Sequence, residues 1–317
     1  MNSHGKMTIR QFWAARNRIL FWIPLGGLGD ILMQRMLFDG ARSVLPEAEI
    51  HVACVESYHD AVRDHPAVSA LHPALGVDLS QYIVHYKTCV TPANRYENHH
   101  GLGCRLHRSD IWAMFCGFGL QGHSMNIRLD PSLLESCRAR LRGSCRKPGM
   151  PVTILAPVSA VATKSLLPDQ LEAVVEAAQE TNIFYSHKCR LPELERMGVD
   201  GLHGTGLREW MHLIASADYV VSVDTAAFHL AGGLGKPLVG IFTFANGKVY
   251  GKYYDFILVQ RHVDDGDWDC GPCYDYKSCP KTSGEIKPCL SELPAHSIAK
   301  AVRAMFERWP HGGSGRV

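Results

Sequence analysis

The sequence predicts an α/β fold built from two Rossmann-like parallel-sheet domains that face a central cleft. Apolar runs typical of buried strands alternate with segments whose apolar residues recur at helical spacing, and this pattern occurs twice along the chain. A stretch with two prolines and a glycine at 146–151 separates the two halves. The length of 317 residues corresponds to a little over two domains at about 150 residues each. Ligands of such sheets bind at the carboxyl ends of strands, so we expect a substrate in the cleft.

The first half begins with an apolar run at 18–24, a glycine turn and then a helix. A strand at 49–54, a short helix at 57–64 and a helix at 109–118 follow, whereas the pattern between 80 and 122 is otherwise weak. The second half is more regular, with strands at 152–156, 183–186, 219–223 and 238–242 and helices at 169–180, 207–215 and 225–234. We therefore divide the chain into domains 1–147 and 148–317, the second ending in an amphipathic helix within 290–309.

Composition excludes several classes of protein. Lys plus Arg number 33 and Asp plus Glu number 31, so the near-zero net charge argues against a nucleic-acid partner. The first 17 residues lack the apolar core of a secretory signal, and the longest uncharged stretch, 111–127, is too short and polar to span a bilayer. We therefore predict a reduced, cytoplasmic protein with seven scattered free thiols: Cys54, Cys89, Cys104, Cys116, Cys137, Cys145 and Cys189.

A glycine turn follows the first strand and ends at Asp30. Backbone N–H groups of Gly26, Gly27 and Gly29 are available there to an anion at the start of the helix. The turn is not a dinucleotide fingerprint, because Leu32 occupies the third glycine position, and the Lys-Ser/Thr pair of a P-loop is absent. Asp30 has two open interpretations: a carboxylate stabilised by the helix N-terminus, or a catalytic group.

The second half has a similar turn, where a buried strand leads to Asp224 and Thr225 at the start of a helix. Thr225 and the following amides could hold a phosphate, and His229 lies one helical turn further on the same face. The alternative, slightly favoured by these residues alone, is a capped helix with a packed histidine. Lys164 follows the first strand of this half and could neutralise a diphosphate, although a solvated loop lysine is the common case.

Four cysteines near the C-terminus have the spacing C-x2-C-x5-C-x9-C. Four thiolates can complete a tetrahedron around zinc or iron, and such a site is structural because no ligand position stays open. Disulfides are the alternative, but they are rare in a reducing compartment. The predicted ligands are Cys270, Cys273, Cys279 and Cys289.

Together these motifs resemble the heptosyltransferases of glycosyltransferase family 9. The segments 19–32 and 221–242 and the Lys164 loop carry the resemblance, which extends over about residues 18–309. The cysteine cluster is similar to that of the autotransporter heptosyltransferases, which carry a four-cysteine iron finger. The resemblance implies a GT-B fold, with an N-terminal acceptor domain and a C-terminal nucleotide-sugar domain. It also implies inverting, metal-independent transfer from a nucleotide sugar, usually ADP-heptose.

The resemblance also implies roles for individual residues. Asp30 corresponds to the general base and Lys164 to the lysine that binds the diphosphate. The nucleotide-sugar loop corresponds to Asp224, Thr225, Ala226 and His229, and the predicted binding set is completed by Gly26, Gly27, Gly29, Thr163 and Thr205. The carboxylate that holds the ribose in the family is Glu193 or Glu195 here, or is absent, and the family's Gly-Pro-Thr after the strand at 238–242 is missing.

We therefore expect an enzyme that transfers a heptose or related sugar to a hydroxyl of a saccharide, of the lipopolysaccharide type, or of a protein. Displacement of a nucleoside diphosphate requires a base for the acceptor hydroxyl and cationic or N–H groups for the leaving group. The alternatives are a nucleotide-sugar epimerase or hydrolase of the same fold, and a non-catalytic binding or assembly module. The sequence leaves the acceptor and a homo-oligomeric state open.

Overall fold

The computed structural model describes residues 17–261, 272–274, 279, 281–282, 284 and 286–312. Its contacts divide these residues into two compact units. Unit 1 contains the described residues up to Tyr96 and Arg108–Arg128, and unit 2 contains Glu97–His107 and the described residues from Leu129 onward. This division lies about one helix before the predicted boundary at 147/148, because α5 (Pro131–Gly143) packs on α8 (Leu207–Ser216) of unit 2.

Unit 1 is built on a four-stranded parallel sheet with the order β3-β2-β1-β4. Its strands are β1 (Arg18–Trp22), β2 (Glu49–Cys54), β3 (Val68–Pro73) and β4 (Val84–Lys87). Its helices include α2 (Leu28–Val44) and α4 (Arg108–Cys116), and α3 (Val90–His100) ends in unit 2. The strands and helices predicted at 18–24, 49–54 and 109–118 are confirmed. The short helix predicted at 57–64 is a 3-10 helix, Glu56–Ala61.

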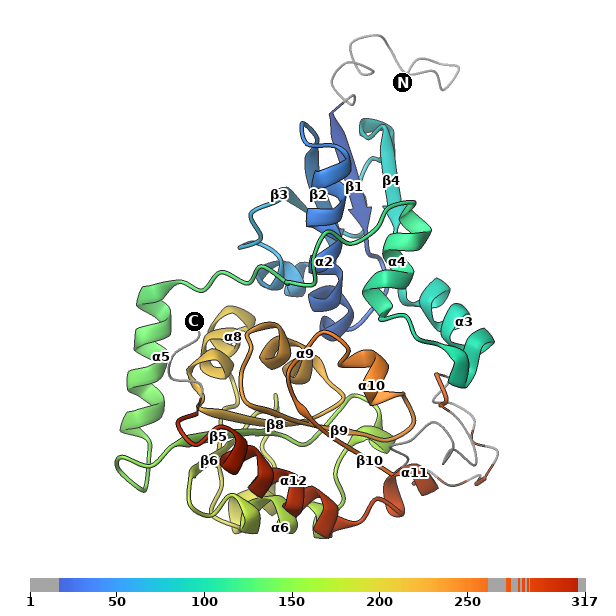
Figure 1. The fold of residues 1–317 in the computed structure, drawn as a ribbon. Helices are drawn as coiled ribbons and strands as arrows, with labels where there is room; N and C mark the ends of the chain where they lie inside the picture. Colours follow the sequence, from blue (N-terminus) through green and yellow to red (C-terminus); the bar gives the residue numbers. More distant parts are fainter. Residues whose placement is uncertain are drawn as a thin grey trace. The chain divides into compact units, whose positions relative to one another are not determined.

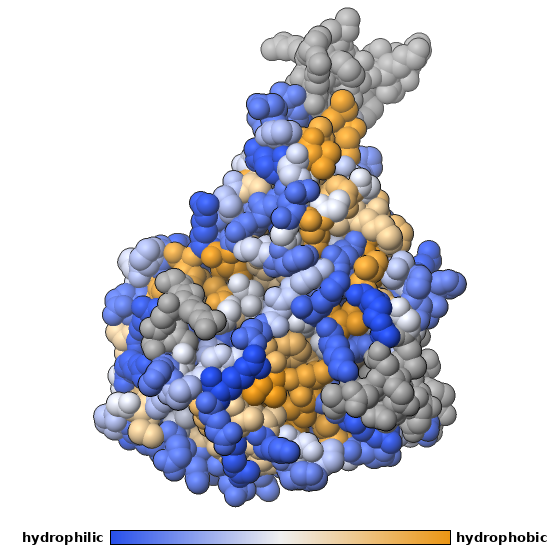
Figure 2. Space-filling view, in the orientation of Figure 1, coloured by the Kyte–Doolittle hydropathy of each residue, from blue (hydrophilic) through white to orange (hydrophobic). Residues whose placement is uncertain are grey.

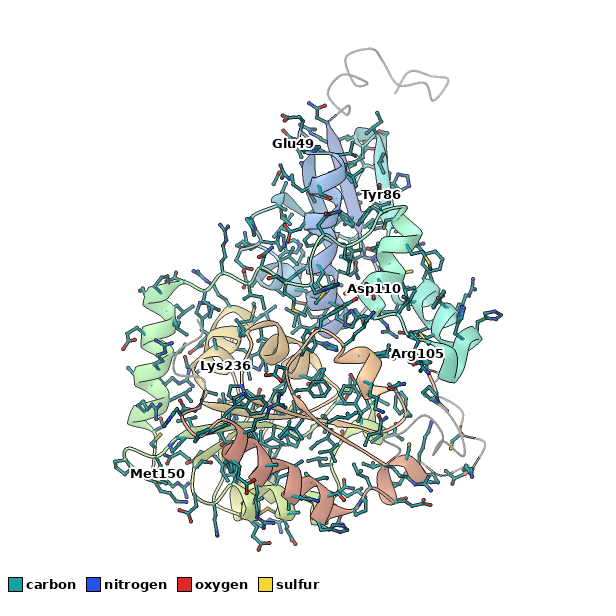
Figure 3. The ribbon with its side chains drawn as sticks, viewed as in Figure 1. Glu49, Tyr86, Arg105, Asp110, Met150 and Lys236 are labelled. Carbon is teal, nitrogen blue, oxygen red and sulfur yellow. The ribbon has the colours of Figure 1, made fainter. Side chains whose placement is uncertain are left out.

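Alternation along β1 separates two apolar layers of unit 1. Phe21 lies on the face covered by α2, with its ring centroid 5.1 Å from that of Phe38 and 5.4 Å from that of Tyr86, which Figure 3 labels on β4. Its neighbour Leu20 lies on the opposite face and packs with Tyr82 and Ala53. The strands β3 and β4 were not predicted, because they are short and their residues are only partly buried.

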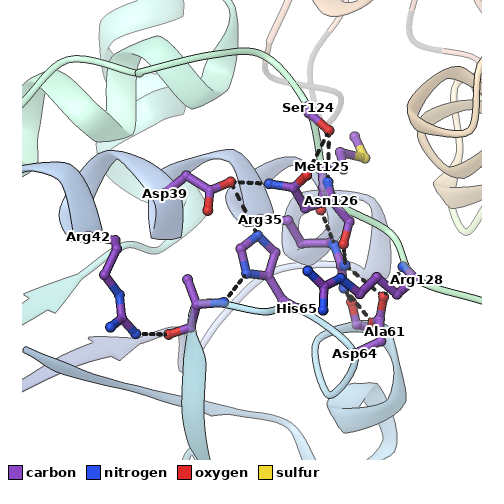
Figure 4. Close-up of polar contacts among 11 residues, drawn as sticks. Arg35, Asp39, Arg42, Ala61, Asp64, His65, Ser124, Met125, Asn126 and Arg128 are labelled. Carbon is purple, nitrogen blue, oxygen red and sulfur yellow. Dashed lines mark hydrogen bonds and ion pairs between the residues drawn. The ribbon is translucent and has the colours of Figure 1, made fainter. Parts of the chain in front are cut away.

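A buried arginine fixes the end of unit 1. The side chain of Arg35 on α2 donates to the carbonyls of Ala61, Met125 and Asn126 and pairs with both carboxylate oxygens of Asp64 (Figure 4). All of these acceptors lie on segments that flank α2, so one charged group holds them together. The network keeps Asn126 at a positive φ of 47°, a conformation that Asn tolerates better than most residues.

Unit 2 is built on a six-stranded parallel sheet with the order β10-β9-β8-β5-β6-β7. Its strands are β5 (Val152–Ala156), β6 (Asn182–Tyr185), β7 (Asp200–Gly201), β8 (Tyr219–Val223), β9 (Leu238–Phe242) and β10 (Ile257–Gln260). Besides α5 and α8, its helices are α6 (Pro168–Ala177), α7 (Pro192–Arg196), α9 (Ala226–Gly233), α10 (Gly247–Tyr250), α11 (Pro288–Ser291) and α12 (Ala295–Arg308).

The predicted alternation in this half is confirmed for all four strands and three helices. The helix predicted within 290–309 is interrupted, because Pro294 has an extended backbone and stands as the N-cap of α12, after the short α11. β7, β10, α7 and α10 were not predicted. Each has only two to five residues, too few to show a period.

Helices cover both faces of the second sheet. In Figure 1, α6 and α12 lie below the strands and α8 and α9 above them. The apolar face of α12, with Ile298, Val302 and Met305 fully buried, joins the core formed by Leu155, Val221 and their neighbours. Polar side chains dominate the face shown in Figure 2, with apolar ones between them. Both faces of β5, β8 and β9 are buried along their whole length, which explains their continuous apolar sequences.

The scattered cysteines differ in exposure. Among the described residues, Cys54, Cys89, Cys116, Cys137, Cys145 and Cys189 form no disulfide, as predicted. The first, second and fourth of these are buried, Cys116 and Cys145 are partly buried, and Cys189 is exposed. Within the described part of the chain, no helix is both long and apolar enough to cross a bilayer.

Candidate functional site

In unit 1, Asp30 lies on the first turn of α2, where β1 ends. Gly27 is the N-cap, and its backbone N–H donates to Asp30 Oδ2 at 2.9 Å. Gly26 has φ +150°, and a Cβ there would lie 3.3 Å from that of Asp30, so the tight turn requires glycine. The predicted N-terminal position of Asp30 is therefore confirmed, and the carboxylate does cap the helix.

A second group holds the same carboxylate. Arg108 Nη1 at the start of α4 lies 2.8 Å from Asp30 Oδ1, and its Nη2 donates to Asn94 Oδ1 at 2.7 Å. The side chains of Asp30 and Arg108 are 14% and 10% exposed, so the pair is shielded but within reach of a ligand. Sequence reasoning missed Arg108 and Asn94, because neither belongs to a periodic pattern and both lie in the stretch with a weak signal.

In unit 2, β5 and β8 are neighbours, and their carboxyl ends bring Lys164 to Asp224. Lys164 Nζ lies 2.6 Å from Asp224 Oδ2, and it also lies 5.2 Å from the centre of the Phe244 ring. The Asp224 side chain is 7% exposed and that of Lys164 is 20% exposed. The structure therefore brings together two residues that the sequence placed 60 positions apart, at the edge where parallel sheets bind ligands.

The N-terminus of α9 lies at the same edge of the sheet, directly after β8 and Asp224. Thr225 is the N-cap, and its Oγ1 accepts a hydrogen bond from the N–H of Ala227 at 3.2 Å. Ala226 is the first residue of the helix. Beside Lys164, the Thr163 side chain is buried, and its hydroxyl has no hydrogen-bond partner within the described part of the chain. Helix N–H groups, a lysine and a hydroxyl are what a phosphate requires.

His229 lies on the buried side of α9. Its Nδ1 is 3.2 Å from the hydroxyl of Tyr254, and its Nε2 is 4.0 Å from Asp224 Oδ1. Burial raises the pKa of the Tyr254 phenol, so the hydroxyl stays protonated and shares a hydrogen bond with Nδ1. In the tautomer with the proton on Nε2, the hydroxyl donates to Nδ1 and the Nε2–H faces Asp224. His229 therefore lies beside the carboxylate that holds Lys164, and Tyr254 is a third residue that sequence reasoning missed.

The remaining predicted binding residues, Thr205 and the two candidate ribose carboxylates, lie farther along the chain than the Lys164 loop. Thr205 follows β7, two strands from the Lys164 loop in the sheet order. Glu195 on α7 accepts two hydrogen bonds from Arg190 and one from the hydroxyl of Tyr185. These bonds, those from Arg190 first, lower the pKa of Glu195 to about 2. Glu193 is exposed, so of the two carboxylates it is Glu195 that is held in a defined position.

The predicted cysteine site is only partly described. Cys270 lies outside the described residues, whereas Cys273, Cys279 and Cys289 are described and partly buried. The N–H of Cys273 donates to the carbonyl of Phe244 at 2.8 Å, which ties this segment to the loop beside Lys164. Among the described residues, no group of three or more His, Cys, Asp or Glu side chains could hold a metal ion.

Comparison with known protein families finds a match, and it lies in unit 2. Residues 140–265, which include the Lys164 loop and the β8–α9 turn, match the model of glycosyltransferase family 9 (heptosyltransferase). This match covers 126 of the 317 residues, all of them in unit 2. It confirms the predicted resemblance to this family, and the chain is a glycosyltransferase. No curated protein sequence matches the chain.

Solved structures extend the likeness beyond residues 140–265. A glycosyltransferase family 9 protein from Veillonella parvula is 12% identical over 92% of this chain and 98% of its own, with a TM-score of 0.64. The ADP-heptose LPS heptosyltransferase II of E. coli is 12% identical over 92% and 99%, with a TM-score of 0.59. TibC of enterotoxigenic E. coli, a dodecameric iron-containing heptosyltransferase solved with ADP-D-β-D-heptose, is 12% identical over 93% and 79%, with a TM-score of 0.66. At these identities the likeness confirms the GT-B fold of two parallel sheets.

Proposed function

We propose that this glycosyltransferase transfers a heptose, with inversion, from ADP-heptose to a hydroxyl of a saccharide or a protein. The observation that carries the donor assignment is the arrangement in unit 2: Lys164 paired with Asp224, beside the N-terminus of α9. The heptosyltransferases of the same fold, one of them solved with ADP-D-β-D-heptose, support the identity of the sugar nucleotide.

Lys164 and α9 would hold the diphosphate. Asp224 holds the lysine ammonium at the strand ends before the donor arrives, so the lysine loses little side-chain freedom when a phosphate binds. The N–H groups at the start of α9 and the Thr163 hydroxyl add donors around the same position. These groups stabilise the negative charge that develops on the diphosphate as the bond to the sugar breaks.

Asp30 would accept the proton of the acceptor hydroxyl. Arg108 and the N–H of Gly27 each bind one of its oxygens and fix the direction of the carboxylate. Since each carboxylate oxygen can accept about two hydrogen bonds, each retains a site for the acceptor hydroxyl. The base acts late, when the hydroxyl proton becomes acidic in the transition state. The step as proposed requires no metal ion.

Donor binding tests the proposal directly. We expect ADP-heptose, and more weakly ADP, to raise the melting temperature of the protein, since a ligand of the native state stabilises it by mass action. UDP-glucose should do so less. The variant Lys164→Met should lose the shift, and Arg303→Met, on the surface of α12, serves as the matched control. No shift with ADP-heptose, or an equal shift in Lys164→Met, would contradict the donor assignment.

Transfer itself is tested with acceptors. Radiolabelled heptose should pass to a lipopolysaccharide core saccharide or to a Ser or Thr hydroxyl of a protein. Turnover of ADP-heptose without any acceptor would instead favour the epimerase or hydrolase alternative. Binding without turnover across a broad acceptor panel would favour the non-catalytic module.

We also propose that Cys270, Cys273, Cys279 and Cys289 hold one iron or zinc ion in a tetrahedral site. The spacing C-x2-C-x5-C-x9-C supports this proposal, and thiolates are the ligands that both ions accept. The ion would stiffen the segment that Cys273 anchors to Phe244. Elemental analysis of protein purified without added metal should find about one ion per chain, and finding neither element would contradict the proposal. Cytoplasmic location and assembly into a homo-oligomer stay predictions.

A further inference from the structure

A cluster of polar rings lies on the face of the unit 1 sheet opposite α2. His51 on β2 and His72 on β3 share this face, because His51 pairs with Ala70 and His72 pairs with Ala53 in the register of the two strands. Tyr82 closes the segment 74–82, which leaves β3 and packs over Leu20 and Ala53. Asp30 begins α2, on the other face, so the proposed sugar transfer does not use these rings.

Three side-chain atoms of the cluster form a compact triangle. His51 Nδ1 lies 3.0 Å from His72 Nε2 and 3.0 Å from the Tyr82 hydroxyl, and that hydroxyl lies 3.2 Å from His72 Nε2. The point equidistant from the three atoms is about 1.8 Å from each, so an ion with metal–ligand distances of about 2.0–2.1 Å fits just above the triangle. Each atom can direct one lone pair toward that point.

Hydrogen bonds can link these three atoms, and a cation would replace them. The carboxylate of Glu49, labelled in Figure 3, lies 3.6 Å from His51 Nε2, which favours the tautomer with the proton on Nε2. His51 Nδ1 then has a lone pair, to which the Tyr82 hydroxyl can donate while its oxygen accepts from His72 Nε2. A cation near the centre of the triangle would take the place of these two hydrogens and bind one lone pair of each atom.

We infer that His51 Nδ1, His72 Nε2 and Tyr82 Oη form a binding site for a divalent transition-metal ion of the Zn²⁺ class. Two neutral imidazoles and a phenolate give the nitrogen and oxygen donor set that such ions accept. Tyr82 releases its phenol proton to solvent as the Zn–O bond forms, and a water molecule takes the fourth position. His72 is only partly buried, which leaves a route for the ion, and Glu49 acts as the outer partner that orients His51.

The three ligands come from two strands and the segment that follows β3. Bound metal would therefore join this segment to the sheet in addition to its apolar contacts. The ion would stabilise unit 1 and take no part in chemistry. This site is independent of the cysteine cluster, which lies in unit 2 and offers sulfur ligands.

Metal titration of the full chain tests the inference. We expect wild-type protein dialysed against Zn²⁺ to retain one equivalent more than His72→Asn, and Zn²⁺ to raise the melting temperature of wild type more than that of this variant. Tyr82→Phe, which retains the ring and its packing, should weaken Zn²⁺ binding at this site at least tenfold. The cysteine cluster is intact in every variant, so its ion contributes equally to all of them.

His59→Asn is the matched control, since His59 Nε2 lies 3.1 Å from the backbone carbonyl of His72 and is not one of the three proposed ligand atoms. This variant should bind as much Zn²⁺ as wild type. Equal Zn²⁺ content in wild type and His72→Asn overturns the inference, as does an affinity unchanged in Tyr82→Phe. Loss of the ion in His59→Asn to the same extent overturns the assignment to this triangle.

Discussion

The β1–α2 turn of unit 1 and the β8–α9 turn of unit 2 each place an aspartate at a helix N-terminus, but a different side chain caps the helix in each. Each has a buried strand followed by an aspartate at a helix N-terminus. A cation from another segment pairs with that aspartate, Arg108 with Asp30 and Lys164 with Asp224. Asp30 caps its own helix by accepting the N–H of Gly27. In the second turn Thr225 caps the helix instead.

This difference separates two roles. Because Thr225 caps the helix, Asp224 is available to hold Lys164, and in the proposed function it would act on the donor through that lysine. In the first turn Asp30 itself caps the helix and also pairs with Arg108, and in the proposed function the same carboxylate would accept the proton of the acceptor hydroxyl. An aspartate at a strand–helix turn can therefore have different roles, depending on which side chain caps the helix.

The largest expected difference between the turns is kinetic. Asp30→Asn should lower kcat by about 10²–10⁴-fold, the usual contribution of a general base, whereas Asp224→Asn should mainly raise the KM for the donor. The side-chain amide in Asp30→Asn retains an oxygen for the N–H of Gly27, so the fold should persist. Steady-state kinetics with ADP-heptose measure both constants. A normal kcat in Asp30→Asn would remove the assigned base.

The two ion pairs should differ in their contribution to stability. Lys164→Met leaves Asp224, only 7% exposed, without its cation and should lower the free energy of unfolding by about 3 kcal/mol. Arg108→Met should cost less, because Asp30 retains the Gly27 N–H and is more exposed. Urea unfolding followed by circular dichroism measures both. The opposite order would show that Arg108, not Lys164, is the main electrostatic support.

The units should also respond to pH in different windows. In unit 1, burial lowers the pKa of His65 to about 3 from 6.5. The unfolded chain then binds the proton more tightly, so stability rises with pH between about 3 and 6.5, by at most about 1.4 kcal/mol per pH unit. In unit 2, burial lowers the pKa of Lys236 (Figure 3) to about 8 from 10.5. By the same reasoning, stability there rises with pH between about 8 and 10.5.

Two variants separate these windows. His65→Asn retains an acceptor for the N–H of Ala67, which now bonds to His65 Nδ1, and should flatten the acid window alone. Lys236→Met loses the bond from Nζ to the carbonyl of Ala215 and should flatten the alkaline window alone. Unfolding free energies from about pH 4 to 10 check both. A variant that altered the other window would show that the two bases are coupled.

The smallest expected effect compares the two caps. Thr225→Ala removes the acceptor for the N–H of Ala227 and should cost about 1 kcal/mol. Gly27→Ala should be close to neutral, because its N–H still donates to Asp30 and the new Cβ would meet only Asp30 Oδ2 at 3.7 Å. Thermal unfolding resolves the pair. Equal costs would mean that Asp30 does not replace a side-chain cap.

Sequence reasoning was most successful where residues are buried on both faces. The continuous apolar runs of β5, β8 and β9 and the repeated helical spacing between them predicted unit 2 nearly element by element. In unit 1, β3 and β4 are half exposed, so their side chains carry no continuous apolar signal. The break before α12 was missed because the helical spacing of the apolar residues continues past Pro294, although proline ends a helix there.

The sequence by itself determined the two parallel sheets and the aspartates that follow β1 and β8, because strand, turn and helix signals are local. Only the tertiary structure decided which cations meet those aspartates, since Arg108 and Asp30 are 78 residues apart. It also decided that α5 belongs to unit 2 and that His51, His72 and Tyr82 meet on one sheet face. Such meetings depend on strand order and packing, which no local pattern encodes.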